Sequence, residues 1–295
     1  MLEKTSFLQE YHLEEAYQRS GIDWKVLEEI YDDYTNNHYD ILQKNALSLV
    51  NDLENQKKKL LDSEKTKVHT IFGRAKDPKH LIEKIIRKVG SENSAKYQKI
   101  DKDNYTDIIR DLIGIRVLVL AKEYWSTVDD LVRLQFQEFE ETPVAYVCYG
   151  DREIFDRKRL SVDYTTKGYR SQHYIVRYKG CFVEIQARTL AEEVYGEFDH
   201  RVRYPYRVSN KFLRRYSGIV SKNSAELDDL ISTCLEIDEP LLDRLDQDFE
   251  RDRYIEWSKR QAASHKETVV SETLETEKIN DAKEMVFKKM ILRKE

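Results

Sequence analysis

The stretch HYIVRYKGCFVEIQA, residues 173–187, decides the fold of this chain because it contains two apolar, β-branched runs with a very short connection. The runs are separated by Lys179, Gly180 and Cys181, and a glycine-containing connection of this length is typical of a β-hairpin. We therefore predict two antiparallel strands, over residues 173–178 and 182–187.

The second of these strands predicts a polar face on the sheet. In VEIQART, residues 183–189, alternation places Glu184, Gln186 and Arg188 on one side and the apolar residues between them on the other. For a single strand, contact with solvent would explain this pattern. The preceding loop KGYRS, residues 167–171, adds a cation, an aromatic ring and a hydroxyl beside the same sheet, and this combination favours a nucleotide site.

Further strands and helices are expected on the N-terminal side of the hairpin. Residues 115–120 and 144–149 are short β-branched or aromatic runs, whereas residues 79–89 and 124–134 have apolar residues at helical spacing. Strands and helices that alternate in this way predict an α+β fold, with a mixed β-sheet flanked by helices.

Both ends of the chain are expected to be helical extensions. Apolar residues recur at helical spacing between residues 22 and 61, and the pattern returns beyond residue 209, where Asp238 and Pro240 are suited to begin a helix. We predict four segments: a helical N-terminal region (1–67), a central domain (68–207), C-terminal helices (208–263) and a charged tail, helical or partly disordered (264–295).

Composition excludes several classes of protein. The 295 residues include 50 Lys and Arg against 55 Asp and Glu, for a net charge of −5, and no apolar run is long enough to cross a membrane. The first residues lack the pattern of a signal peptide, so a cytoplasmic protein is expected. The nine glycines are never closer than twelve positions apart, which excludes Walker A and GxGxxG loops. Any nucleotide phosphate must then be held mainly by side chains and metal.

A candidate metal ligand precedes the strand in DLIGIRVLVL, residues 111–120. Asp111 stands immediately before the apolar run, and Arg116 lies within it. An acid at a strand end, next to Glu184 on a neighbouring strand, would hold one Mg²⁺ and leave positions for phosphate oxygens. The alternative role for Asp111 is that of a helix or turn cap.

A basic cluster lies in FGRAKDPKHLIEKIIRK, residues 72–88. Arg74 and Lys76 precede the expected helix in an extended segment, and Lys84 lies on the helix itself. These cations would bind phosphates near the helix N-terminus, which also favours anions. A solvated surface helix is the alternative.

Four segments in this order resemble the synthetase domain of RelA/SpoT proteins, which make the alarmones ppGpp and pppGpp. They are GRAKDPKHLIEK (73–84), DLIGIR (111–116), GYRSQH (168–173) and EIQART (184–189) with a closing His200. The resemblance covers residues 68–206 and implies a nucleotidyltransferase-like core. It also implies an ATP pyrophosphokinase that moves the β- and γ-phosphates of ATP together to a ribose 3′-hydroxyl and releases AMP.

The resemblance assigns roles to individual residues. It implies that Asp111 and Glu184 are the Mg²⁺ ligands, with Glu184 also the candidate base. The remaining roles follow the same match: ATP binding by Arg74, Lys76, Lys84 and Arg116, acceptor binding by Tyr169, His173, Lys167 and Arg170, and support from Gln186, Arg188 and His200.

The acceptor is less well defined than the donor. The family pattern usually has Ser where His80 stands, Trp where Tyr195 stands, and a longer loop in place of residues 163–167. We expect GDP or GTP as acceptor. The alternatives are a toxin-type enzyme that modifies the 3′ end of tRNA or makes adenosine alarmones, with an antitoxin as partner, and an inactive binding protein. The family also implies a homo-oligomer.

Overall fold

The computed structural model describes residues 2–91, 95–148, 154–165, 168–203, 207 and 210–237. The chain divides into two compact units, Met1–Leu235 and Glu236–Glu295. The helix predicted to begin near Asp238 and the charged tail lie outside the described residues.

The described residues form one six-stranded mixed sheet in the order β1-β2-β6-β5-β3-β4. Its strands are β1 (Val68–Ala75), β2 (Ile113–Val119), β3 (Val144–Val147), β4 (Ser161–Tyr164), β5 (Ser171–Tyr178) and β6 (Cys181–Thr189). The pairs β2–β6 and β3–β4 are parallel and the other neighbours are antiparallel. The predicted mixed sheet is therefore confirmed.

Two of the six strands were not predicted as strands. The segment of β1 was expected only to be extended, because Gly73 and several exposed residues interrupt its apolar pattern. Strand β4 has four residues, most of them exposed, so no buried face distinguishes it as a strand. Both strands lie at the edges of the sheet, where pairing with a neighbour on one side defines them.

The hairpin β5–β6 forms as predicted, with a turn shorter than expected. Tyr178 pairs with Cys181, so only Lys179 and Gly180 form the turn. Both have positive φ, 50° and 80°, which is the geometry of a two-residue turn that matches strand twist. The turn fixes the register that places Glu184 and His173 on the same face.

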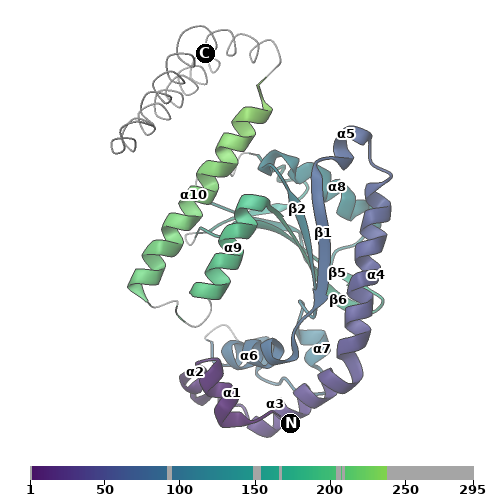
Figure 1. Ribbon diagram of the computed structural model, residues 1–295. Helices are drawn as coiled ribbons and strands as arrows, with labels where there is room; N and C mark the ends of the chain where they lie inside the picture. Colours follow the sequence, from purple (N-terminus) through teal and green to yellow (C-terminus); the bar gives the residue numbers. More distant parts are fainter. Residues whose placement is uncertain are drawn as a thin grey trace, which may run out of the picture. The chain divides into compact units, whose positions relative to one another are not determined.

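Helices surround the sheet, and Figure 1 shows α4 and α9 on different sides of it. The α-helices are α1 (Lys4–Glu10), α2 (Glu14–Ser20), α3 (Trp24–Asp33), α4 (Tyr39–Lys57), α5 (Asp62–Lys65), α6 (Pro78–Val89), α7 (Tyr105–Ile108), α8 (Trp125–Gln135), α9 (Leu190–Val202) and α10 (Lys211–Leu235). Short helical segments also span Tyr34–His38 (π), Ala95–Tyr97 and Lys122–Tyr124 (both 3₁₀). No described helix is long and apolar enough to cross a bilayer.

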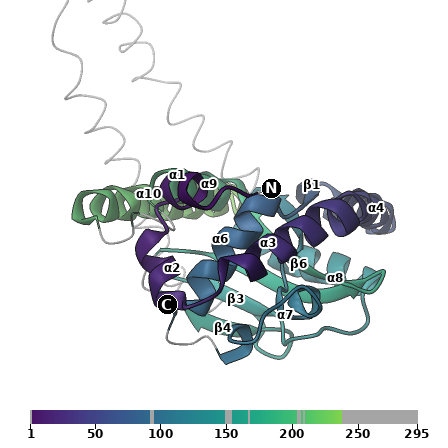
Figure 2. The ribbon, with the colours of Figure 1, turned by 90° about the horizontal axis from the view of Figure 1, so that it is seen from below.

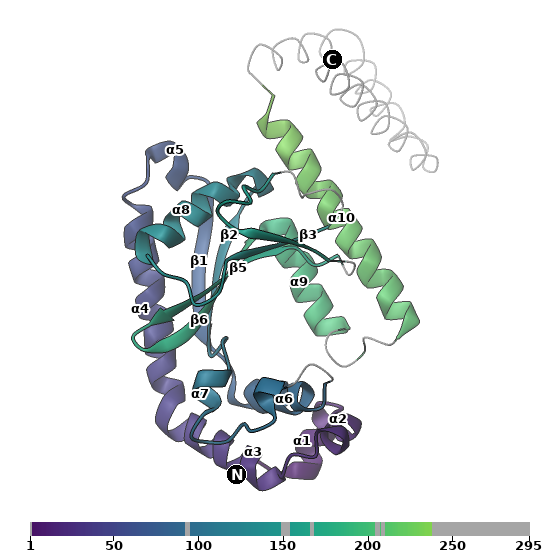
Figure 3. The same cartoon turned by 180° about the vertical axis from the view of Figure 1, so that it is seen from behind.

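The main core lies between one face of the sheet and helices α4 and α8, which Figure 3 shows from behind. Alternate residues such as Ile115, Val117, Val183 and Ile185 point into it and are fully buried. The opposite face is left for polar side chains.

Helix α6 is stabilised by its N-cap and by the burial of its apolar side. The carboxylate of Asp77 accepts hydrogen bonds from the backbone N–H groups of Lys79 and His80, and Pro78 occupies the first turn. Its apolar residues are buried in the core, and α3 runs alongside (Figure 2). The hydroxyl of Tyr34 donates to the backbone oxygen of Lys76 at 2.8 Å and so fixes the connection between β1 and α6.

Candidate active site

The register of four strands gathers the predicted polar side chains on one face. Paired residues of neighbouring strands point the same way, so residues that pair across β1, β2, β6 and β5 form rows. The first row is Arg74, Gly114 and Glu184, and the second is Arg116, Gln186 and His173. Arg188 follows beside Leu118, and its Nε donates to the Ser171 hydroxyl at 3.3 Å. The side of β6 that carries Glu184, Gln186 and Arg188 is therefore part of a sheet face to which several strands contribute.

Gly114 leaves open space in the first row. It lies between Arg74 and Glu184, and a Cβ added there would have no heavy atom within 4 Å. Arg74 is exposed and forms no ion pair with any described residue. The face therefore offers room and a free cation beside a carboxylate.

Asp111 lies between two lysines of the basic cluster. Its Oδ1 is 2.7 Å from Nζ of Lys84 on α6, and its Oδ2 is 2.9 Å from Nζ of Lys76. Burial acts to raise the pKa of Asp111, but the two ammonium groups outweigh it and hold that pKa well below its usual range. Asp111 is therefore ionised, and the alternative role of a helix or turn cap is not needed to explain its position.

Glu184 is the second ionised acid of this face. Its Oε1 lies 3.1 Å from Nδ1 of His173, and its Oε2 accepts from Nε2 of Gln186 at 2.6 Å. Burial opposes ionisation, but the hydrogen bond and the attraction of His173 lower the pKa of Glu184 below its usual value. The charges of Asp111 and Lys84 also act on this carboxyl, so the two acids share one electrostatic environment.

Further cations surround Asp111. Lys88 is half-buried, and its pKa is lowered by burial and by the charges of Arg87, Lys84 and Lys96. Four cations held close enough to repel one another indicate a place for an anion of high charge.

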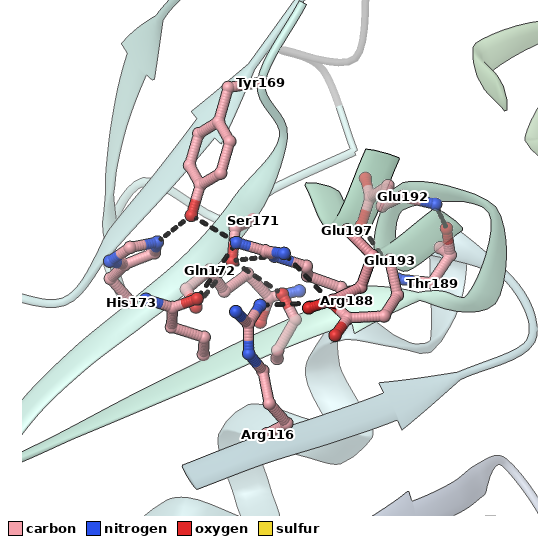
Figure 4. A network of polar contacts seen from close by, with 12 residues as sticks. Arg116, Tyr169, Ser171, Gln172, His173, Arg188, Thr189, Glu192, Glu193 and Glu197 are labelled. Carbon is pink, nitrogen blue, oxygen red and sulfur yellow. Dashed lines mark hydrogen bonds and ion pairs between the residues drawn. The ribbon is translucent and has the colours of Figure 1, made fainter. Parts of the chain in front are cut away.

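A chain of hydrogen bonds runs from Arg188 through Tyr169 to His173 (Figure 4). It continues from His173 to Glu184. Nη2 of Arg188 donates to the Tyr169 hydroxyl at 2.7 Å, and that hydroxyl lies 2.8 Å from Nε2 of His173. All bonds are satisfied when Tyr169 donates to Nε2 and His173 donates from Nδ1 to Glu184. The chain therefore orients the half-buried ring of Tyr169 and the carboxylate of Glu184 together.

Glu193 is a site residue that was not predicted. Its Oε2 lies 3.0 Å from Nη1 of Arg116 and 2.9 Å from Nη1 of Arg188, so one carboxylate holds both guanidinium groups (Figure 4). Thr189 and Glu192 form a capping box that begins α9 and so place Glu193 over the sheet. The signal was present in the sequence as an acid in the first turn after EIQART.

The structure also describes two other predicted residues, Arg170 and His200. Arg170 is buried, with Nη2 2.7 Å from Oδ2 of Asp228 on α10. His200 lies near the end of α9, where partial burial and the charges of Arg188 and Arg116 lower its pKa. Lys167 lies outside the described residues, so its acceptor role stays a prediction.

The two acids fit a magnesium ion that also binds phosphate. The described residues contain no group of three or more His, Cys, Asp or Glu side chains that would hold a metal by themselves. Mg²⁺ is commonly held by one or two carboxylates together with water and substrate phosphates. Asp111 and Glu184, both ionised and beside a set of cations, suit that kind of site.

Comparison with known proteins gives a family match to the central part of the chain. Residues 73–209 match the model described as the region found in RelA / SpoT proteins. This part of the chain is therefore similar to that region, and the match supports a pyrophosphotransferase activity. No curated protein matches the chain.

Several solved structures are similar to the chain. A GTP pyrophosphokinase family protein from Streptococcus pneumoniae has a TM-score of 0.49 and 20% identity, over 65% of this chain and 88% of that one. The small alarmone synthetase 1 from Bacillus subtilis has a TM-score of 0.49 and 19% identity, over 68% and 95% of the two chains. The same synthetase bound to its product pppGpp has a TM-score of 0.43 and 20% identity, over 65% and 91%.

Proposed function

We propose that this protein transfers the β- and γ-phosphates of ATP, as one unit, to the 3′-hydroxyl of GDP or GTP and releases AMP. The bond that forms joins the ribose oxygen to the β-phosphorus, and the bond that breaks joins that phosphorus to the oxygen shared with the α-phosphate. The observation that carries the proposal is the pair of ionised acids Asp111 and Glu184 among cations on one open face of the sheet.

The cations suit the donor nucleotide. Phosphoryl transfer asks a protein mainly to position phosphates and to neutralise their charge. Lys76 and Lys84 form ion pairs with Asp111. Arg74 is exposed in the first row, beside the open space at Gly114. A triphosphate bound there would replace the carboxylate as the partner of the two lysines. Mg²⁺, when bound by Asp111 and Glu184, would neutralise charge on the transferred phosphates.

The hydrogen-bond chain suits the acceptor. Glu184 has a lowered pKa and is therefore a weak base, so we propose that it orients the acceptor hydroxyl and accepts its proton only as the new bond forms. His173 holds one carboxylate oxygen and Gln186 holds the other, which fixes the direction of the carboxylate. The ring of Tyr169, fixed through its hydroxyl, is the proposed stacking surface for the base.

The test is an acceptor assay with ATP labelled at the γ-phosphate. Purified protein with Mg²⁺ is given GDP, GTP, adenine nucleotides or bulk tRNA, and AMP and labelled products are separated. We expect label on GDP or GTP, and loss of at least about 100-fold of that activity in Glu184→Gln. Glu138→Gln, at an exposed acid outside the face, is the control and should keep full activity. Label on tRNA or adenine nucleotides alone would replace the proposed acceptor, and no transfer to any acceptor would reject the activity.

A further inference from the structure

Helix α10 holds the segment that carries Tyr169. The segment Gly168–Arg170 leads into β5 and contains the ring proposed to stack on the acceptor. Helix α10 contacts the residue before Tyr169, which is Gly168, and the residue after it, which is Arg170. Helix α10 begins at Lys211, beyond the matched RelA/SpoT region at residues 73–209.

The first contact fixes the backbone before Tyr169. The hydroxyl of Ser221 donates to the backbone oxygen of Gly168 at 2.9 Å, and Ser221 is 1% exposed. Gly168 has φ of 77°, a conformation that other residues rarely adopt. A buried hydrogen bond to this oxygen therefore stabilises an unusual backbone turn directly before the ring.

The second contact fixes the side chain after Tyr169. Nη2 of Arg170 lies 2.7 Å from Oδ2 of Asp228, and the two side chains are 3% and 0% exposed. Burial raises the pKa of Asp228, and Arg170 and Thr189, the N-cap of α9, act against that rise. A buried ion pair costs much desolvation, so it is weak evidence for added stability but fixes geometry well.

The contacts make a continuous path from α10 to the candidate catalytic acid. Tyr169 lies between the two fixed residues, and its hydroxyl joins His173, which joins Glu184. A shift of α10 would therefore move the acceptor ring and the residue that orients Glu184.

From this geometry we infer that Asp228 and Ser221 are positioning residues for the acceptor, acting from outside the RelA/SpoT region through Arg170 and Gly168. Arg170 then serves the acceptor through Tyr169 instead of touching it. The inference rests on the proposed function, because it assigns Tyr169 to the acceptor. It predicts that acceptor binding depends on α10, whereas ATP binding at Lys76 and Lys84, the two lysines that contact Asp111, does not.

The experiment compares two variants with two matched controls on the same helix of the full chain. The variants are Asp228→Asn and Ser221→Ala. The controls are Asp229→Asn, whose 64% exposed carboxylate pairs with Lys122, and Ser232→Ala, whose hydroxyl donates to Glu123. None of these four residues is placed in the catalytic or binding machinery. KM for the acceptor and for ATP, kcat and the thermal midpoint are measured for each protein.

We expect Asp228→Asn and Ser221→Ala to raise the acceptor KM by roughly tenfold and leave the ATP KM within about twofold, because a small misplacement of a positioning group has a large effect. The controls should change neither KM. Equal changes in both KM values, or acceptor KM values like those of the controls, would overturn the inference. Ser221→Ala keeps the test valid if Asp228→Asn, which removes the nearer of two acids from the buried guanidinium of Arg170, fails to fold.

A second measurement separates this inference from the proposed activity. Amide hydrogen exchange of residues 168–174 is followed in the same proteins without nucleotide. Faster exchange in Asp228→Asn and Ser221→Ala than in the controls supports the positioning role even where the wild-type protein transfers pyrophosphate to no tested acceptor. Unchanged exchange with an active wild-type enzyme rejects the positioning role and leaves the activity standing.

Discussion

Nδ1 of His173 on β5 lies 3.1 Å from Oε1 of Glu184 on β6, so a hydrogen bond crosses between neighbouring strands on the polar face of the sheet. The two residues are diagonal neighbours, since His173 pairs with Gln186 and Glu184 pairs with Ile175. The other ring nitrogen of His173 lies 2.8 Å from the Tyr169 hydroxyl, so both nitrogens have partners. The orientation of the carboxylate therefore depends on a tyrosine in the loop before β5.

Tyr169→Phe tests the role of the Tyr169 hydroxyl separately from the role of the ring. The ring remains for stacking, but Nε2 of His173 loses its donor and Arg188 loses an acceptor. We expect kcat to fall by roughly 10- to 100-fold with little change in acceptor KM, because the acid is less well oriented. Tyr169→Ala should raise the acceptor KM as well.

Nitrogen NMR of His173 provides the structural readout for the same variant. The wild-type ring should be protonated on Nδ1, and in Tyr169→Phe the Glu184 carboxylate should keep the proton there while the Nε2 resonance shifts because it loses its donor. An unchanged Nε2 resonance together with wild-type kcat would contradict the role given to this hydroxyl.

The site could be predicted from the sequence where its pattern is local. The alternation of Glu184, Gln186 and Arg188 and the short connection at Gly180 are properties of one hairpin, so they are visible without the fold. Strand β4, in contrast, is a strand because β3 lies beside it, and nothing in its four residues indicates that neighbour.

Ion pairs between residues far apart in the sequence could not be predicted. Arg170 has the same sequence context whether its partner is a phosphate or Asp228, and only packing of α10 brings that carboxylate to it. Asp111 was predicted as a metal ligand from its place before β2, but its contacts with Lys76 and Lys84 follow from the path of the chain from β1 into α6.

Lys84→Met should change the affinity of the polar face for a divalent cation in the absence of nucleotide. In the wild-type protein both oxygens of Asp111 contact lysines, so a divalent cation must compete with Lys76 and Lys84. Removing one ammonium should tighten binding of Mn²⁺ alone by roughly tenfold, equivalent to about 1.4 kcal/mol. The same change should weaken binding of a non-hydrolysable ATP analogue, since a phosphate partner is lost.

Electron paramagnetic resonance of free Mn²⁺ measures this binding without any turnover. The control is Lys79→Met, which removes a charge from the same helix at a position where the ammonium pairs with Glu10. Equal Mn²⁺ affinity in Lys84→Met and wild type would show that the lysines do not compete with metal at Asp111.

Asp33 should make the fold sensitive to acid. It accepts from Asn37 at 2.8 Å and from the Tyr105 hydroxyl at 2.7 Å, and His38 lies 3.3 Å away. Burial acts to raise the pKa of Asp33, but these partners outweigh it and lower the pKa below the usual 3.8. A carboxyl with a lowered folded pKa contributes stability that is present above the unfolded pKa and is lost as pH falls through the folded value.

Asp33→Asn should therefore lose about 1 kcal/mol at pH 7 and less as the pH approaches 3. Denaturant unfolding between pH 7 and pH 3 measures this difference. Asp32→Asn, at the exposed neighbour, is the control and should follow the wild type at every pH. A loss for Asp33→Asn that stays constant down to pH 3 would argue that its hydrogen bonds do not depend on charge.

Gly196→Ala should disturb the site through Arg188. A Cβ on Gly196 would overlap Nη1 of Arg188, the atom that contacts Glu193. The guanidinium is 3% exposed and has several fixed partners, so it has little room to move. We expect a loss of stability of about 1–3 kcal/mol and a lower kcat, because overpacking displaces a group that holds Tyr169.

The matched control is Gly218→Ala on α10, where an added Cβ meets no heavy atom within 4 Å. Since alanine is the better helix former, that variant should gain about 0.5–1 kcal/mol with unchanged kcat. If Gly196→Ala were also stabilising and fully active, close packing of α9 on Arg188 would not be needed to hold the site together.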